Sequence, residues 1–284
     1  MIVVTGAGGQ LGRLIALALS ERIAPDRVRL GSREPGKLAD LAEKGFATAP
    51  ADFDRPETLE RAFAGAEAVL IVSGDAPNEL RIRQHRAAID AAKRVGAGRV
   101  LYTSFTNPGP ASLFPFAAIH ADSEAHLKAS GVPFTILRNN LYAENLAGAL
   151  ANAKSTGTLA LPGARGKVAF IRRADLAAAT AGALIGSDHA GRIYELTGPE
   201  ALDLHEIAEV ASAAWGRPVS AAEMPPETFA GILRGYGLPP FVVEAIVALR
   251  EAVRAGEYAA VSPDASRLAG RPVMSIRDYV AALR

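Results

Sequence analysis

The first twelve residues hold the feature that most constrains the fold. An apolar run that includes Val3 and Val4 breaks into a glycine-rich turn, and apolar residues then return at helical spacing. Gly6, Gly9 and Gly12 are spaced three residues apart. A strand, a tight turn and a helix in this order form the context in which glycines build a phosphate-binding turn. The sequence therefore predicts a strand-turn-helix unit at the start of an α/β domain.

Each part of this turn has a predicted role toward a pyrophosphate. The first glycine permits the sharp turn, the middle ones leave the backbone open to phosphate, and the last lets the helix pack closely on the strand. The first residues of the helix add free N–H groups and a partial positive charge. The alternative is a glycine-rich turn that binds nothing. We predict dinucleotide contacts at Gly6, Gly8, Gly9, Gln10, Leu11 and Gly12.

Short apolar runs and helical patterns alternate as far as residue 137. This alternation predicts right-handed βαβ units, and hence a doubly wound parallel sheet of the Rossmann type with helices on both faces. We expect strands near 2–5, 28–31, 46–49, 68–72, 99–103 and 134–137. Helices are expected near 10–20, 36–44, 56–64, 78–95 and 117–130.

The pattern loosens after Arg138. We predict a dinucleotide-binding domain over residues 1–155 and a smaller α/β lobe over 156–284, with a strand near 192–196 that could rejoin the main sheet. Ligands bind at the carboxyl edge of such sheets, so the lobe is expected to supply the substrate pocket. The other elements expected are strands near 158–161 and 168–171, and helices near 141–154, 174–186, 203–215, 226–235, 239–254 and 275–283.

Composition narrows the classes of partner. The chain has 284 residues and a formal net charge of +1, so bulk electrostatics favour neither nucleic acid nor an anionic membrane. It has no cysteine, which excludes a disulfide or a thiolate nucleophile, and its five histidines lack metal-ligand spacing. No apolar run approaches the roughly 20 residues that span a bilayer. We expect a cytoplasmic protein, monomeric or homodimeric, that binds no metal.

The end of the second predicted strand indicates which dinucleotide is bound. Proteins that select NAD usually place an acidic residue there to bind the ribose 2′-hydroxyl. This chain has Gly31-Ser32-Arg33 instead, so no acid repels a 2′-phosphate, and the arginine can hold one by a charge-assisted contact. Ser32 and Lys37 are placed to assist. The alternative is that Arg33 is a solvated surface charge. We predict NADPH as the cofactor.

The ends of three later strands carry further candidate contacts. An acidic and an aromatic residue follow the third strand, where they can border the adenine, and small polar residues end the fourth and fifth strands. Each pair is also ordinary turn chemistry. Their shared place at the sheet edge favours cofactor contacts at Asp52, Phe53, Ser73, Gly74, Thr103 and Ser104.

A common catalytic pair is absent. Short-chain dehydrogenases use Tyr-x-x-x-Lys, in which the lysine lowers the pKa of the tyrosine. None of the six tyrosines is followed by a lysine four residues later. Alcohol oxidation or sugar-nucleotide epimerisation by that mechanism is therefore not expected.

Motifs along nearly the whole chain resemble those of one family. The sequence resembles the NmrA-like, atypical short-chain dehydrogenases, and among them the quinone and triphenylmethane dye reductases. The stretches that carry the resemblance are Thr5-Gly6, Gln10-Leu11-Gly12, Arg33, Gln84-His85-Arg86, Tyr102-Thr103-Ser104, His120 with Glu124, Leu137-Arg138-Asn139, Tyr142 with Glu144-Asn145, Arg173-Ala174-Asp175, Tyr194-Glu195-Leu196 and Gly237-Leu238-Pro239.

The resemblance implies an enzyme that passes hydride from NADPH to a quinone or a similar flat conjugated acceptor. Such an acceptor needs no strong general acid, so the missing dyad is tolerable. Some members of the family are instead redox sensors that bind the dinucleotide without turnover, and this is the alternative function.

Position after the sixth strand suggests the catalytic residues. We predict that Asn139 orients the nicotinamide carboxamide or the acceptor oxygen, and that Tyr142 contacts the acceptor, with core packing as its alternative role. Arg138 and Asn139 complete the predicted cofactor contacts. His120 and Glu124 are interpreted as a simple pair one helical turn apart. Phe114, Phe116 and Phe170 are candidates for an apolar wall facing the acceptor.

Overall fold

A seven-stranded parallel sheet forms the centre of the computed structural model, which describes residues 1–74 and 76–283. The strand order is β3-β2-β1-β4-β5-β6-β8, and every neighbouring pair is parallel. The order reverses between β1 and β4, which places a crevice at their carboxyl ends. The strands are β1 (Ile2–Val4), β2 (Val28–Ser32), β3 (Ala47–Pro50), β4 (Ala68–Ile71), β5 (Val100–Phe105), β6 (Phe134–Asn139) and β8 (Arg192–Leu196).

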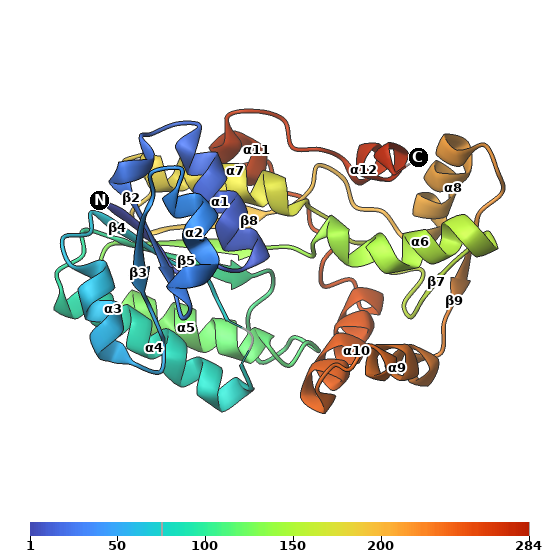
Figure 1. The fold of residues 1–284 in the computed structure, drawn as a ribbon. Coiled ribbons are helices and arrows are strands. Elements are labelled where there is room, and N and C mark those ends of the chain that lie inside the picture. Colours follow the sequence, from blue (N-terminus) through green and yellow to red (C-terminus); the bar gives the residue numbers. More distant parts are fainter. Residues whose placement is uncertain (75, 284) are drawn as a thin grey trace.

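Helices cover both faces of the sheet (Figure 1). One layer contains α1 (Gln10–Ser20), α7 (Arg173–Ile185) and α11 (Asp264–Ala269), and the other contains α3 (Pro56–Phe63), α4 (Asn78–Arg94) and α5 (Ala117–Ala129). Two short segments, η2 (Pro35–Leu38) and α2 (Ala39–Ala42), follow β2, and η1 (Pro25–Arg27) precedes it. Because both faces are covered, β4 is fully buried, which explains its unbroken apolar sequence.

The remaining elements form a lobe at one end of the sheet (Figure 1). It consists of η3 (Ala143–Leu146), α6 (Ala147–Thr156), β7 (Thr158–Leu161), α8 (Leu204–Trp215), β9 (Ser220–Glu223), α9 (Pro226–Gly235), α10 (Pro240–Arg254) and α12 (Ile276–Ala282). β7 and β9 pair in parallel as a separate two-stranded sheet. The lobe has its own apolar core, which includes Leu150, Leu159, Ile207 and Tyr258.

The predicted α/β class, the doubly wound sheet and the return of the strand at 192–196 are confirmed. The strand expected at 168–171 is wrong, because this segment forms only two isolated bridges, Val168 with Leu202 and Ile171 with Tyr142. The short elements β9 and α11 were not predicted. β8, α7 and α11 all follow residue 155 yet pack with the Rossmann half. Division of the chain at residue 155 stays a prediction.

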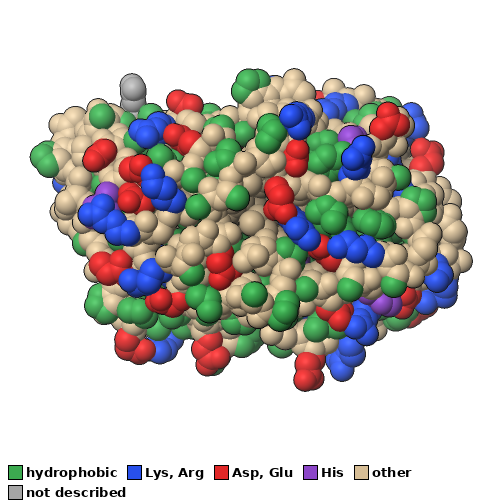
Figure 2. Space-filling model, turned by 180° about the vertical axis from the view of Figure 1, so that it is seen from behind, with side chains coloured by type: hydrophobic (Ala, Val, Ile, Leu, Met, Phe, Trp, Pro, Cys, Tyr) green, Lys and Arg blue, Asp and Glu red, His purple; other side chains and the backbone are tan. Residues whose placement is uncertain are grey.

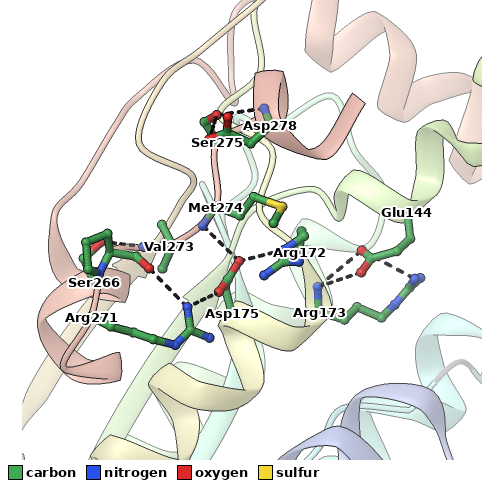
Figure 3. A network of polar contacts seen from close by, with 11 residues as sticks. Glu144, Arg172, Arg173, Asp175, Ser266, Arg271, Val273, Met274, Ser275 and Asp278 are labelled. Atoms are coloured by element: carbon green, nitrogen blue, oxygen red, sulfur yellow. Dashed lines mark hydrogen bonds and ion pairs between the residues drawn. The ribbon is translucent and has the colours of Figure 1, made fainter. Parts of the chain in front are cut away.

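A buried carboxylate ties the start of α7 to the C-terminal segment (Figure 3). Asp175 accepts hydrogen bonds from Arg172 Nε at 2.9 Å, Arg271 Nη1 at 2.8 Å and the Met274 N–H at 3.1 Å. Burial alone would raise the pKa of Asp175, but the two arginines hold it below its ordinary value. The contacts therefore fasten the chain beyond α11 to the Rossmann half.

On the face turned away in Figure 1, acidic and basic side chains are interspersed, in keeping with the small net charge (Figure 2). Among the described residues, none of the helices has both the length and the apolar character needed to cross a membrane.

Candidate active site

The glycine turn is built as a phosphate-binding turn requires. Gly6 has a φ of +62°, and its carbonyl accepts a hydrogen bond from the Gly9 N–H at 3.0 Å. A Cβ at Gly12 would lie 2.3 Å from the Gly6 oxygen, so only glycine fits where α1 crosses the turn. Gly9 caps α1 without a side-chain hydrogen bond to the helix. The first N–H groups of α1 are therefore not capped by a side chain and suit an anion.

A cavity of about 280 Å³ lies beside this turn, at the carboxyl ends of β1 to β4. Arg33 is exposed at its rim and forms no ion pair with another described residue, whereas the neighbouring Lys37 pairs with Glu34 at 2.7 Å. The predicted cofactor residues that line this cavity are Gly6, Gly8, Gly9, Ser32, Arg33, Lys37, Asp52, Phe53 and Gly74.

Three residues of the glycine turn that were predicted to contact the dinucleotide do not line the first cavity. Gln10 is the exposed first residue of α1, Leu11 is buried in the core below the turn, and Gly12 packs against Gly6. Gln10 and Leu11 still stand in the first turn of the helix, where their backbone N–H groups have no partner within α1.

A second cavity, of about 190 Å³, continues along the same sheet edge. It begins where the first one ends, because Val72 and Gly74 line the first cavity while Ser73 lines the second. Of the predicted residues, the second cavity brings together Ser73, Ser104, Phe114, Phe116, Asn139 and Tyr142. Thr103 is buried beside it, and its hydroxyl accepts the Ser73 N–H at 2.9 Å. The two cavities therefore follow one another along the carboxyl edge of the sheet.

Asn139 carries a polar atom that the protein leaves unsatisfied. It is the last residue of β6 and only 1% exposed, and its Oδ1 has no hydrogen-bond partner among the described residues. An unpaired buried acceptor costs roughly 1–3 kcal/mol. In a residue that lines a cavity, such a cost is expected where a bound ligand supplies the missing donor.

Tyr142 is held at the same cavity by its backbone and by a cation. It forms an isolated bridge with Ile171, and the guanidinium of Arg173 lies 4.6 Å from the centre of its ring. Burial raises the pKa of the Tyr142 hydroxyl, while the Arg173 charge opposes this shift. Arg173 in turn pairs with Glu144 (Figure 3). The phenol therefore stays protonated and can donate a hydrogen bond into the cavity.

His120 is a site residue whose role the sequence did not reveal. The interpretation of His120 and Glu124 as a simple helical pair is wrong, because they point to different partners. Glu124 accepts hydrogen bonds from Ser104 Oγ and Arg138 Nε, each at 2.8 Å. His120 lines the second cavity, and its Nδ1 lies 2.8 Å from the Tyr102 hydroxyl. The one signal in the sequence was Tyr102, which lies in the middle of the apolar strand β5, where a buried hydroxyl needs a hydrogen-bond partner.

The hydrogen-bond network assigns the proton on His120. The Gly74 N–H donates to His85 Nε2 at 3.3 Å, so neutral His85 carries its proton on Nδ1 and donates to Ser123 Oγ at 2.9 Å. Nε2 of His120 faces the guanidinium of Arg81 at 3.5 Å, and a guanidinium can only donate, so Nε2 accepts and the His120 proton lies on Nδ1, which donates to the Tyr102 hydroxyl at 2.8 Å. Burial, with the charge of Arg81, holds the pKa of His120 well below its ordinary value. The neutral ring therefore directs its N–H to Tyr102 and the lone pair of Nε2 toward Arg81.

Arg138, which was predicted to contact the cofactor, lines neither the first nor the second cavity. Its guanidinium binds Glu124 and, at 3.0 Å, Glu195, and it lines a different cavity together with Thr106 and Thr197. The hydrogen bonds that Arg138 donates to Glu124 raise the pKa of Arg138 further. With its donors engaged by two carboxylates, Arg138 is placed to support β6 and α5 rather than to reach a ligand in the second cavity.

Among the described residues, no cluster of histidine, aspartate and glutamate side chains could hold a metal ion. The site therefore offers a phosphate-binding turn, an arginine without an ion-pair partner among the described residues, an unsatisfied amide oxygen and a neutral phenol donor. The NmrA-like family matches residues 1–271. The chain belongs to the NmrA-like family.

Three similar proteins are named as reductases or oxidoreductases. The chain is 31% identical to quinone oxidoreductase 2 of Escherichia coli, over 100% of this chain and 98% of that protein. A crystal structure of that enzyme with NADPH superposes with a TM-score of 0.92 and covers 100% of this chain and 99% of the other. NAD(P)H azoreductase of Xenophilus azovorans is 27% identical, over 99% and 97% of the two chains. Triphenylmethane reductase of Citrobacter sp., complexed with NADP(H), is 28% identical with a TM-score of 0.93, and both chains are fully covered.

Proposed function

We propose that the chain is a reductase that passes hydride from NADPH to a quinone or a similar flat conjugated acceptor. The observation that carries the proposal is the buried, unsatisfied Oδ1 of Asn139, in the cavity that continues from the glycine turn. The names of the relatives, which include quinone, azo and dye reductases, support the same chemistry.

The proposed cofactor contacts follow the two cavities. The glycine turn and the first N–H groups of α1 hold the pyrophosphate, Arg33 with Ser32 holds the 2′-phosphate, and Asp52 with Phe53 borders the adenine. Ser73, Gly74, Thr103 and Ser104 flank the path toward Asn139, whose Oδ1 accepts a hydrogen bond from the nicotinamide carboxamide. Arg138 is left out, because its donors are engaged by Glu124 and Glu195. Bound NADPH supplies the hydride.

The residues around the second cavity act on the acceptor. Phe114 and Phe116 provide an apolar wall for a flat ring, and the Tyr142 hydroxyl is a donor for its oxygen. Hydride addition to a quinone leaves negative charge on that oxygen, and a fixed donor stabilises it. Solvent supplies the final proton.

The test follows oxidation of NADPH and NADH with and without benzoquinone, menadione and a triphenylmethane dye. We expect each conjugated acceptor to accelerate NADPH oxidation and NADPH to be preferred. Tight NADPH binding without acceleration by any acceptor would instead favour the redox-sensor alternative. Which acceptor is reduced best separates a quinone reductase from a dye reductase.

We also propose a cytoplasmic location and a monomeric or homodimeric state. Fractionation of the cells that produce the protein tests the first, and the mass measured by light scattering tests the second.

A further inference from the structure

A third and larger cavity, of about 570 Å³, lies inside the lobe. Its walls come from α6, β7, α9 and α10, which lie together in Figure 1, and they are mostly apolar, with Leu161, Phe170 and Ile246 among them. A volume of this size is typical of sites that hold a small organic molecule. The third cavity is distinct from the first cavity, which lies at the glycine turn, and shares no lining residue with it.

The third cavity adjoins the second. Leu141, Asn145 and Leu249 line both of them, so one wall is shared between the space next to Asn139 and the space inside the lobe. A molecule whose conjugated ring lies against Tyr142 can therefore extend past Leu249 into the lobe. The shared wall makes the third cavity an extension of the acceptor site.

One charged group lines this apolar cavity. Arg250 of α10 is only 6% exposed, and its Nε donates to the Pro162 carbonyl at 2.8 Å. No carboxylate of residues 1–74 or 76–283 lies within ion-pair distance of its guanidinium. Burial lowers the pKa of Arg250 to about 10, so it is still a cation at neutral pH.

The acidic side chain whose charge acts on Arg250 is Glu223, and it is engaged by other groups. Glu223 accepts the N–H groups of Gly163 and Ala164, each at 2.8 Å, and pairs with Arg254 at 2.7 Å. A buried cation is normally paired, because removing it from water is expensive. The lone guanidinium at an apolar cavity therefore has the character of a binding group for an anion.

We propose that the natural acceptor is elongated and amphipathic: a conjugated ring with an apolar extension that ends in an anionic oxygen group, bound by Arg250. This substrate class rests on the proposed reductase function. The ring lies at Asn139 and Tyr142, the extension lies in the third cavity, and the anion completes the coordination of the guanidinium.

The main test compares naphthoquinones that carry an alkyl chain ending in a carboxylate with their methyl esters, at graded chain lengths. We expect a KM about tenfold lower for the carboxylate at the best length. The preference should vanish in Arg250→Met and survive in part in Arg250→Lys. Arg254→Gln is the matched control, since Arg254 lies one turn further along α10, half-exposed and outside the cavity, and it should keep the preference.

Equal KM values for carboxylate and ester in the wild type, or an unchanged preference in Arg250→Met, would overturn the proposal. A binding measurement separates this failure from failure of the reductase function. Calorimetry on the cofactor-free protein should show dodecanoate binding at least tenfold tighter than dodecanol. This result would support the Arg250 site even if no quinone were reduced, and equal affinities would refute it. The wild-type and Arg250→Lys data decide the matter if Arg250→Met fails to fold.

Discussion

The Tyr102 hydroxyl lies 2.8 Å from Nδ1 of His120, and because Nε2 of that ring faces the guanidinium of Arg81, the His120 proton lies on Nδ1 and is donated to Tyr102. Tyr102→Phe removes the bond without changing the shape of the core. The His120 ring then loses the acceptor that fixes its orientation at the second cavity, and we expect kcat/KM for menadione to fall about tenfold while the Kd for NADPH stays the same.

Steady-state kinetics and fluorescence titration of NADPH measure these two effects. Tyr279→Phe on α12, whose hydroxyl has no hydrogen bond with another described residue, is the control for loss of a phenol. Full turnover by Tyr102→Phe would show that the orientation of the His120 ring does not matter for the reaction.

Asn139→Leu replaces the unsatisfied amide with a side chain of similar size. Because the wild type leaves Oδ1 unpaired, the substitution removes only the hydrogen bond of the Asn139 side chain with Tyr142, and we expect a loss of at most about 1 kcal/mol in the free energy of unfolding. NADPH should nevertheless bind at least tenfold more weakly. Asn140→Leu provides the contrast, since its amide donates to Tyr258 and accepts from Leu141. That variant should lose about 2 kcal/mol of stability in urea unfolding. Unchanged NADPH affinity in Asn139→Leu would remove Asn139 from the cofactor site.

Arg33→Ala tests the 2′-phosphate contact. A charge-assisted bond to phosphate is worth roughly 1.5–3 kcal/mol, so the Kd for NADPH should rise at least about tenfold while the Kd for NADH barely moves. Lys37→Ala is the matched control, because that lysine is already paired with Glu34. We expect its effect on NADPH to be much smaller. A ratio of NADPH to NADH affinity that is equal in Arg33→Ala and the wild type would contradict the assignment.

His85 makes stability depend on pH. Burial, with the charge of Arg81, lowers the pKa of His85 to about 3, whereas the ring titrates near 6.5 in the unfolded chain. Between these pH values His85 is protonated in the unfolded state and neutral in the folded state. The free energy of unfolding therefore falls as the pH drops below about 6.5. Between pH 7 and pH 5 the wild type should lose about 2 kcal/mol more than His85→Asn. Urea unfolding at the two pH values measures the difference, and equal losses would refute it.

Asp175→Asn tests the anchor of the C-terminal segment. The substitution keeps the shape but removes the charge that Arg172 and Arg271 neutralise. Since both arginines are partly exposed, we expect a loss of about 2 kcal/mol in the free energy of unfolding, reduced by high salt. The carboxylate stabilises the fold above its unfolded pKa, and this stabilisation is lost as the pH falls through the depressed folded pKa. Stability equal to the wild type at low salt would show that the anchor is not ionic.

The elements that position the cofactor were predictable because their signals are local. The glycine turn, β2 ending at Arg33 and the apolar run of β4 each follow from neighbouring residues, and parallel strands then bring their carboxyl ends to one edge. Elements with weak or short sequence patterns were predicted poorly. β9 has only four residues and was not predicted. The segment 168–171 was predicted as a strand, but it forms only isolated bridges with Tyr142 and Leu202.

By itself, the sequence determined the α/β class and the glycine turn, because backbone geometry and hydrophobic period depend on neighbouring residues. Its motifs showed the resemblance to the NmrA-like family. Tertiary structure alone decided that His120 faces a cavity while Glu124 binds Arg138, and that Arg250 is buried without an ion-pair partner among the described residues. These facts depend on which groups meet across the core, and the charge or proton that a side chain carries there depends on neighbours far away in the chain.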